Sequence, residues 1–422
     1  MNSDNQIIRG GYTIGKSIAS GSYGIVRLAQ KDMTQFAIKI SNISGNMGMS
    51  EIIEVDVVKR INHPNIIKFI DIFVDEVISD RDDIYSESYC PNNYDPDADH
   101  DLCIFYVMLL ADQTLESKIE QLRTCTPFDK LQLIYKIIAA VSFLHTNNIY
   151  HGDLKPKNIL MFGDIPVIAD FGLSGYLHVK EYSPGTLAYA APEVVYVFNA
   201  KIFEHHLKLP SQYIDELKRV VDDKRKLDVW SLGMIIGEIL TGDYIFSPQG
   251  FSSILDDQDK YLRDKNIHEI YIPLLKLLLD PHPITRLSDL NHVLSLPIFS
   301  SMTSIPGTII NHNKLSFKRD FSPFIEHINN IYKSGSSTGS KILAGNILCR
   351  CFDLVCEDIN DISIIIAACV LIASKLYMIE CFHVEKLCDL CVNRFEPRDL
   401  IKMEAKIVIK LSGIMFTNIL VK

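Results

Sequence analysis

The sequence predicts an α+β fold up to about Phe299 and an all-α region after it. The first observation is that two stretches of alternating apolar residues flank a glycine-rich segment, a pattern typical of strands joined by a tight loop. The second is that apolar residues recur at helical spacing from Phe321 onward. The chain has 422 residues, which allows two domains, and its hydrophobic fraction of 47% is ample for buried cores.

The glycine-rich segment is the first candidate binding element. Glycines let a backbone approach phosphate oxygens closely, although Ala19 replaces the first glycine here. The candidate ATP-binding residues of this segment are Ile18, Ala19, Ser20, Gly21, Ser22, Tyr23, Gly24, Ile25 and Val26. The following strand carries Lys39, which would grip the α- and β-phosphates. A helical stretch at about 50–61 offers two carboxylates to hold this lysine, Glu54 and, one turn earlier, Glu51.

A polar loop and an Asp-Phe-Gly triplet supply the second candidate element. Transfer of a γ-phosphoryl group depends on positioning and charge neutralisation. Asp153 is placed to accept the proton of the attacking hydroxyl, and Lys155 can reach the transferring phosphate. Asn158 and Asp170 supply oxygen donors of the kind that Mg²⁺ prefers. Two short strands with a turn at Gly163 would bring these two donors together, which predicts ATP and Mg²⁺ as cofactors.

These motifs resemble those of the eukaryotic protein kinase family, and the resemblance covers residues 12–299. It implies a bilobal fold with a β-rich small lobe and an α-rich large lobe. It also favours Glu54 over Glu51 as the partner of Lys39. Lys155, in the context Asp-Leu-Lys-Pro, is similar to that of serine/threonine kinases, so the resemblance implies protein substrates with serine or threonine hydroxyls.

The resemblance assigns roles to residues outside these motifs. Adenine would be bound by backbone groups around Leu109 and Ala111, which follow the gatekeeper-like Met108. Arg286 would pair with Glu193, the glutamate that closes the activation segment.

Gly152 departs from the family, because regulated kinases normally carry arginine there. Ile53 replaces a second arginine, which cyclin-dependent kinases carry on the corresponding helix. Phosphorylated loops need such cations, so we expect activity without phosphorylation of Tyr182 or Ser183. The residues that would bind phosphate and metal, and the candidate base, are nevertheless all present (Lys39, Asp153, Asn158 and Asp170), which predicts an active kinase. The alternative is a pseudokinase scaffold in which the C-terminal region recruits another kinase, and an Asp153→Asn comparison in a phosphate-transfer assay distinguishes the two.

Charge is distributed unevenly along the chain. The formal net charge is −10, which does not suggest nucleic-acid binding. Residues 75–101 hold ten acidic residues and one arginine, and the resemblance makes this segment an insertion between two strands of the small lobe. It is either a solvated loop or a docking surface for a basic partner. A second insertion is expected at about 198–222 in the large lobe, and a polar linker at 300–320.

The region 321–422 is predicted to form five helices. They are expected at 321–332, 342–357, 362–379, 382–393 and 396–411. The strings Leu371–Lys375 and Met403–Glu404 resemble a single cyclin box, which implies that Lys375 and Glu404 meet a kinase. In that family the apolar residue pressed into the box lies on the kinase helix that carries the glutamate, which points to Ile52.

A kinase and a cyclin-like box in one chain suggest regulation in cis. The box would hold the helix so that Glu54 reaches Lys39. Alternatively, the box captures a separate kinase or is inert. Truncation after Ser300 distinguishes these interpretations, because equal activity of the isolated kinase domain would exclude activation in cis.

The sequence also bears on location and redox state. The first residues lack a signal-peptide pattern, and the longest apolar run, 364–373, is too short to span a bilayer. We therefore expect no membrane partner and an intracellular location, in cytoplasm or nucleus. A chain that joins a kinase to a cyclin-like box resembles the fusions of large DNA viruses. If the protein is viral, its expected location is inside the host cell. Cysteines should be reduced; zinc at Cys349, Cys351, Cys388 and Cys391 is the alternative to buried structural thiols.

Overall fold

The computed structural model divides the chain into two compact units. The first unit comprises residues 1–62, 68–110 and 309–422, and the second comprises residues 63–67 and 111–308. The residues that the structure describes are 7–21, 24–44, 47–77, 101–177, 185–196, 211–217, 223–245, 250–309, 328, 331–332, 338–355, 362–377, 384–390 and 395–411.

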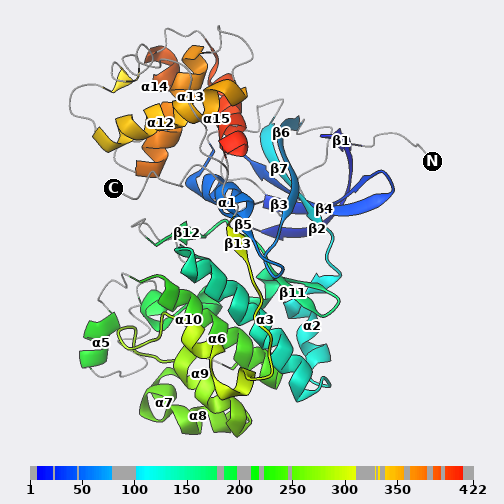
Figure 1. The fold of residues 1–422 in the computed structure, drawn as a ribbon, viewed down its shortest axis with the longest axis vertical. Coiled ribbons are helices and arrows are strands. Elements are labelled where there is room, and N and C mark those ends of the chain that lie inside the picture. The colour runs from blue at the N-terminus through cyan, green and yellow to red at the C-terminus, as the bar shows by residue number, and fades with distance from the viewer. Residues whose placement is uncertain are drawn as a thin grey trace. The chain divides into compact units, whose positions relative to one another are not determined.

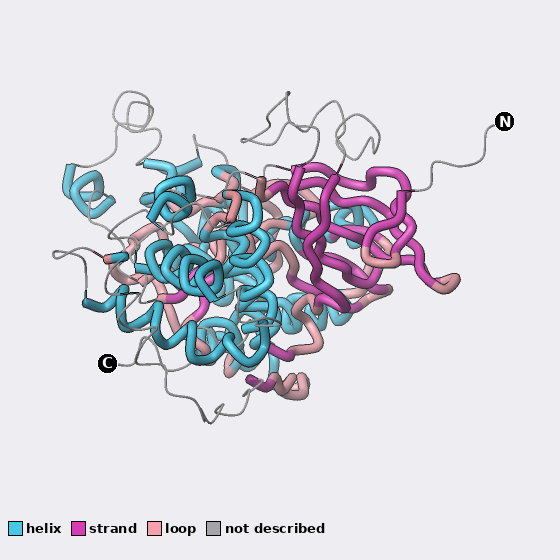
Figure 2. The backbone as a smooth tube through the Cα atoms, turned by 90° about the horizontal axis from the view of Figure 1, so that it is seen from above, coloured by secondary structure: helices cyan, strands magenta, loops and turns pink. Residues whose placement is uncertain are grey.

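The first unit contains an antiparallel sheet, whose described strands run side by side in Figures 1 and 2. In chain order they are β1 (Ile7–Arg9), β2 (Tyr12–Gly21), β3 (Gly24–Lys31), β4 (Thr34–Asn42), β6 (Phe69–Val77) and β7 (Asp101–Leu109). In space their order is β1-β2-β3-β4-β7-β6. Alternate side chains of a strand point to one face, and the apolar core built this way contains Tyr12, Ile14, Ile25, Ala29, Ile38, Ile40, Val77, Cys103, Phe105 and Val107.

Helix α1 (Met49–Arg60) follows β4 and leads into β5 (Ile61–Asn62). One continuous stretch of the helix is buried, from Ile52 to Val58. The residue before its first turn is Gly48, whose position carries no side-chain hydrogen bond to the helix. The local sequence therefore leaves the first N–H groups of α1 without the cap that serine, threonine or aspartate would supply.

The C-terminal part of the first unit is helical. Its described helices are α12 (Thr338–Val355), α13 (Ile362–Tyr377), α14 (Val384–Leu390) and α15 (Pro397–Leu411). Helix α13 is buried from Ile365 to Ser374 and packs against α12 and α15, as its nearly uniform apolar sequence predicts. Helix α15 also packs against α1 and β6. Helix α12 begins four residues before the expected position 342, and the expected helix 321–332 lies largely outside the described residues.

The second unit is mainly helical (Figure 1). Its described helices are α2 (Leu115–Leu122), α3 (Pro127–Thr146), α5 (Ser211–Leu217), α6 (Arg225–Thr241), α7 (Gly250–Asp256), α8 (Gln258–Asp264), α9 (Ile272–Leu278) and α10 (Leu290–Leu294). Short 3₁₀ turns occur at Pro156–Asn158, Leu187–Tyr189, Glu269–Tyr271 and Pro297–Phe299. Thr126 caps α3, and Gly242 ends α6 in the left-handed conformation. The central helix α6 packs against α3 and α9.

Short strands of the second unit frame the predicted catalytic loop. Strands β10 (Ile159–Phe162) and β11 (Ile165–Ile168) form the predicted hairpin, which turns at Gly163 with φ +59°. Strand β8 (Gln113–Thr114) extends this sheet, and β9 (Ile149–Tyr150) pairs with β12 (Gly175–Tyr176). Strand β13 (Thr308–Ile309) lies where the chain passes from the second unit to the first.

The predicted fold class is confirmed: a β-rich lobe precedes a helical lobe, and a helical region follows. The acidic segment starts within β6 and ends at the first residue of β7, with 78–100 outside the described residues. Of the second insertion, the structure describes only α5, and of the expected linker only residues 300–309. Within the part of the chain that the structure describes, no helix is long and apolar enough to cross a membrane.

The cysteines of the C-terminal region are described in part. Cys351 and Cys388 are buried, and the sulfur of Cys351 lies 3.7 Å from that of Cys369 on the neighbouring helix α13. The side chains of Cys349 and Cys391 lie outside the described residues. The zinc alternative therefore stays untested.

Candidate active site

A buried ion pair in the first unit joins the sheet to α1. The Nζ atom of Lys39, on β4, lies 2.8 Å from each carboxylate oxygen of Glu54. Both residues are nearly inaccessible, with 8% and 3% of their surfaces exposed. Glu51, the alternative partner, instead accepts a hydrogen bond from the Ser50 hydroxyl at 2.8 Å. Position along the helix decides the choice, because Glu54 falls within the buried stretch of α1.

The glycine-rich segment is the β2–β3 hairpin. Its first four candidate residues end β2 and its last three begin β3, while Ser22 and Tyr23 lie outside the described residues. Ala19 pairs with Val26 in the antiparallel ladder. The side chain of Ile25 is completely buried in the sheet core. Only its backbone remains for a ligand.

Gly24 is required by close packing of the hairpin on β4. Its φ is +144°, and a Cβ atom placed there would lie 2.4 Å from the carbonyl oxygen of Ile40. Any side chain at this position would push β3 and β4 apart.

The candidate adenine-binding residues lie on either side of a point in the chain where the first unit ends and the second begins. Leu109 is the last residue of β7 and is 54% exposed, whereas the gatekeeper-like Met108 is buried. Ala111, which belongs to the second unit, is partly buried. Leu109 still pairs with Phe36 of β4 in the sheet.

Asp153 is the centre of a hydrogen-bond network in the second unit. Lys155 Nζ lies 2.7 Å from Asp153 Oδ2, and the same ammonium donates to the Thr186 hydroxyl at 2.7 Å. The Thr186 backbone N–H donates to Asp153 Oδ1 at 2.7 Å. Burial acts to raise the pKa of Asp153, but the hydrogen bonds and charge of Lys155 and the bonds from Thr186 outweigh it and hold the pKa below its ordinary value. Asp153 is therefore ionised at neutral pH.

The candidate metal ligands are joined through the β10–β11 hairpin. The N–H of Ala169, the residue before Asp170, donates to the Asn158 carbonyl oxygen at 2.9 Å. The amide nitrogen of Asn158 donates to the carbonyl oxygen of Asp153 at 2.9 Å, which leaves its Oδ1 as the atom suited to a cation. Asp170 adopts a left-handed φ of +63°. A carboxylate and a carboxamide oxygen from neighbouring segments fit a magnesium ion by their donor chemistry.

Asp228, near the start of α6, holds the backbone of the catalytic loop. Its carboxylate accepts the N–H groups of His151 at 2.7 Å and Gly152 at 2.9 Å, and it also contacts His145 Nε2 at 2.9 Å. Sequence reasoning missed this role. The available signal was a carboxylate in an otherwise apolar stretch, which must find partners when it is buried.

Gly152 itself adopts a conformation that favours glycine. Its φ is +81°, and a Cβ atom there would lie 2.4 Å from the carbonyl oxygen of Leu173. The loop that precedes Asp153 is therefore packed around a residue without a side chain. Tyr182 and Ser183, whose phosphorylation is not expected to be required for activity, lie outside the described residues.

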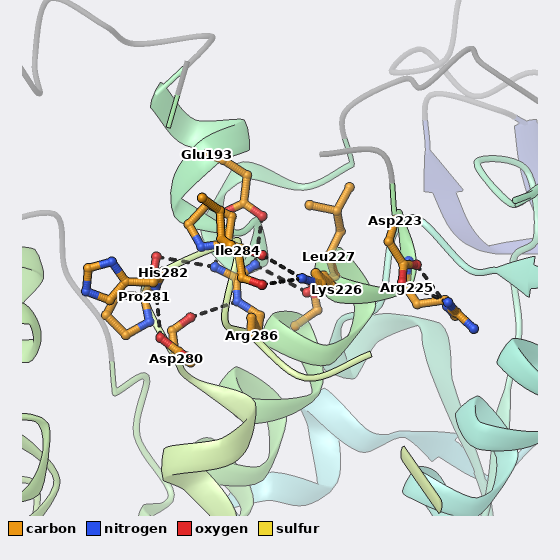
Figure 3. A network of polar contacts seen from close by, with 12 residues as sticks. Glu193, Asp223, Arg225, Lys226, Leu227, Asp280, Pro281, His282, Ile284 and Arg286 are labelled. Carbon is orange, nitrogen blue, oxygen red and sulfur yellow. Dashed lines mark hydrogen bonds and ion pairs between the residues drawn. The ribbon is translucent and has the colours of Figure 1, made fainter. Parts of the chain in front are cut away.

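A second buried ion pair ties the end of the activation segment to the helical core (Figure 3). Arg286 Nη1 and Nη2 lie 2.7 Å and 3.0 Å from the two oxygens of Glu193, the bidentate geometry that favours arginine. The guanidinium also lies 5.1 Å from the ring of Trp230. Nearby, Lys226 donates to the carbonyl oxygens of Pro283 and Ile284. The structure thus brings together the pair that the sequence predicted.

A hollow in the surface of the second unit lies beside Asp153 and holds both the candidate base and the glycine before it. Its lining residues are Gly152, Asp153, Leu154, Gly185, Thr186, Tyr189, Ala190, Ala191, Leu227, Asp228 and Ser231.

In the first unit, the candidate cyclin-like residues meet the segment that enters α1. Lys375 Nζ donates to the Met47 carbonyl oxygen at 2.6 Å and also contacts the Glu404 carboxylate. Burial raises the pKa of Glu404, against the opposing influence of Lys375 and the Met47 backbone. Ile52 is completely buried on α1, the helix that packs against α15. At the far end of α1, Lys59 Nζ donates to the Ile409 carbonyl oxygen at 2.9 Å.

Two family models match the chain. The protein kinase domain matches residues 12–299, and the cyclin N-terminal domain matches residues 324–415. A calcium/calmodulin-dependent protein kinase of Metarhizium anisopliae is 30% identical over 255 residues, which is 58% of this chain and 54% of that protein. Myosin light chain kinase A of Dictyostelium discoideum is 29% identical, over 55% of this chain and 66% of that protein. CBL-interacting protein kinase 30 of Oryza sativa subsp. japonica is 27% identical, over 71% of this chain and 56% of that protein.

The chain spans between 54% and 66% of the length of these three relatives. The kinase match covers more than half of the chain, and a further relative, 28% identical, is named as the probable serine/threonine-protein kinase MARK-C of Dictyostelium discoideum. The matched residues include the candidate catalytic groups of each unit. The chain therefore belongs to the protein kinase family, with a cyclin N-terminal domain after its kinase domain.

Proposed function

We propose that the protein transfers the γ-phosphoryl group of ATP to serine and threonine hydroxyls of protein substrates, and that its own cyclin domain activates it in cis. Asp153 accepts the proton of the substrate hydroxyl, and its lowered pKa keeps it in the basic form. Lys155 supplies positive charge next to the attacking oxygen.

The remaining residues hold the nucleotide. Lys39, oriented by Glu54, binds the α- and β-phosphates, with the β2–β3 hairpin over them. Backbone groups at Leu109 and Ala111 bind the adenine. Asn158 and Asp170 would hold Mg²⁺, which neutralises phosphate charge when it is bound.

The observation that carries activation in cis is the contact of Lys375 with Met47. The carbonyl oxygen of Met47 belongs to the peptide that leads into Gly48, the uncapped start of α1. The hydrogen bond from Lys375 holds this peptide, so the cyclin domain fixes the point where α1 begins. Ile52 lies four residues after Gly48. Glu54, the partner of Lys39, lies about half a helical turn after Ile52. Fixing the start of α1 therefore favours the Lys39–Glu54 pair.

Two substitutions in the full-length chain test the proposal. Lys375→Met removes the contact with Met47 and leaves the Glu404 carboxylate buried without its cation. Loss of one member of a buried pair costs about 3–5 kcal/mol, so we expect kcat/KM to fall at least about tenfold. Glu385→Gln, on the exposed surface of α14, is the control for removal of a charge from this domain. Wild-type activity of Lys375→Met would exclude activation in cis.

The catalytic assignment has a separate test. Radiolabelled phosphate transfer with Mg²⁺ should be abolished by Asp153→Asn, since the amide cannot accept the hydroxyl proton. Equal transfer by the wild type and this variant would support a scaffold role in place of a kinase.

A further inference from the structure

The acidic segment that the sequence singled out begins on an ordered strand. Glu76 is the penultimate residue of β6 and pairs with Leu102 of β7. Its backbone carbonyl oxygen accepts a hydrogen bond from Arg9 Nε at 2.9 Å. Strand β7 on one side and the Arg9 side chain therefore hold the backbone of Glu76, from which its carboxylate extends.

Two cations of the cyclin domain meet this carboxylate. Lys402 Nζ contacts Glu76 Oε1, and Arg398 Nη2 lies 3.4 Å from Glu76 Oε2. The two cations are four residues apart on α15, so they lie on one face of that helix. Helix α15 packs against β6 at the same place.

The contact of Glu76 with Arg398 and Lys402 is more exposed to solvent than the contact of Lys375 with Met47 and Glu404. The side chains of Glu76, Arg398 and Lys402 are between 37% and 43% exposed, whereas those of Lys375 and Glu404 are 10% and 0% exposed. Salt screens exposed charges within about one Debye length, roughly 10 Å at moderate ionic strength, and screens buried charges much less. The contact of Lys375 on α13 and the contact of Arg398 and Lys402 on α15 should therefore respond differently to added salt.

We propose that Glu76 is an electrostatic docking residue for α15, and that its contact with Arg398 and Lys402 makes attachment of the cyclin domain to the sheet dependent on ionic strength. This inference rests on the proposed activation in cis and adds its salt-sensitive component. It also gives the start of the acidic segment a partner within the same chain. A foreign basic protein would have to displace two cations that Glu76 already binds.

The test is hydrogen–deuterium exchange of the full-length chain at low and high sodium chloride. In the wild type, α15 should exchange faster as salt rises. Glu76→Lys should accelerate exchange of α15 at low salt by about fivefold, the scale of a few exposed ion pairs, and should reverse the salt dependence, because salt then screens a repulsion between the introduced lysine and the two cations. Combining Glu76→Lys with Lys402→Glu should restore part of the protection. Glu385→Lys, the same charge reversal at an exposed position of α14, should behave like the wild type.

The outcomes separate this inference from the proposed function. If α15 exchanges at the same rate in Glu76→Lys and Glu385→Lys, or if its exchange rate in the wild type does not change with salt, Glu76 is not a docking residue. The kinase activity of Lys375→Met then still decides whether activation occurs in cis. If Glu76→Lys accelerates α15 exchange while Lys375→Met retains full kinase activity, the docking contact stands and activation in cis fails.

Discussion

Gly152 offers the sharpest test of the catalytic geometry, through Gly152→Ala. A Cβ atom at this position would lie 2.4 Å from the carbonyl oxygen of Leu173, a backbone atom that cannot rotate away. The peptide is also held from the other side, because its N–H donates to Asp228 Oδ1 at 2.9 Å. The loop must move to admit one methyl group, and Asp153 is the next residue.

The size of the effect follows from two contributions. A left-handed φ costs an L-residue about 1–2 kcal/mol, whatever surrounds it. Displacement of Asp153 adds a kinetic cost, since a misplacement of about 1 Å at a reacting group lowers the rate about 100-fold. Gly163→Ala isolates the first contribution. Gly163 has φ +59°, but a Cβ atom placed there would have no neighbouring atom within 4 Å.

The assay is kcat for phosphate transfer at saturating ATP, with the melting temperature of each variant as a check on folding. We expect Gly163→Ala to lower the melting temperature slightly and to keep its kcat. Gly152→Ala should lower kcat about 100-fold, by the same displacement argument. If Gly152→Ala and Gly163→Ala have equal kcat values, packing against Leu173 does not position Asp153, and the reasoning is refuted.

Two further substitutions probe the second unit. Arg286→Met leaves the Glu193 carboxylate buried and unpaired, so the free energy of unfolding in urea should fall by about 3–5 kcal/mol; Arg123→Met, at an exposed ion pair, should change it little, and equal effects would contradict the burial argument. Lys155→Met removes the main cation that holds the pKa of Asp153 down, so the acid limb of the kcat/KM profile should move to higher pH; an unmoved limb would show that Asp153 does not set it.

The elements that were predicted well are those encoded locally. The β10–β11 hairpin was predicted from two apolar strings around Gly163, and the structure pairs Ile159 with Ile168 as that pattern requires. The burial of α13 followed from its nearly uniform apolar sequence. In both cases neighbouring residues alone determine which face is buried.

The elements that were missed depend on residues far apart in the chain. Asp228 binds the N–H groups of His151 and Gly152 across more than seventy positions, and Glu76 meets Lys402 across 326. No local periodicity marks either contact. The burial of Ile25 in the sheet core was missed for a related reason, since only the register of β3 against its neighbours shows which face it occupies.

Gly152 and Ile53 both stand where a phosphate-dependent kinase would carry arginine, and the contacts of α1 suggest one reason for the two differences. Ile53 is buried within α1, where an arginine would need a partner for its charge. Gly48 gives the start of α1 no side-chain cap, and Lys375 donates a hydrogen bond to the carbonyl oxygen of the preceding residue, Met47. A helix whose position is set by contacts within the chain needs no phosphate-dependent contact to reach it. Glycine and isoleucine at these two positions are consistent with the proposed activation in cis, in which the cyclin domain and not a phosphorylated loop orders Glu54.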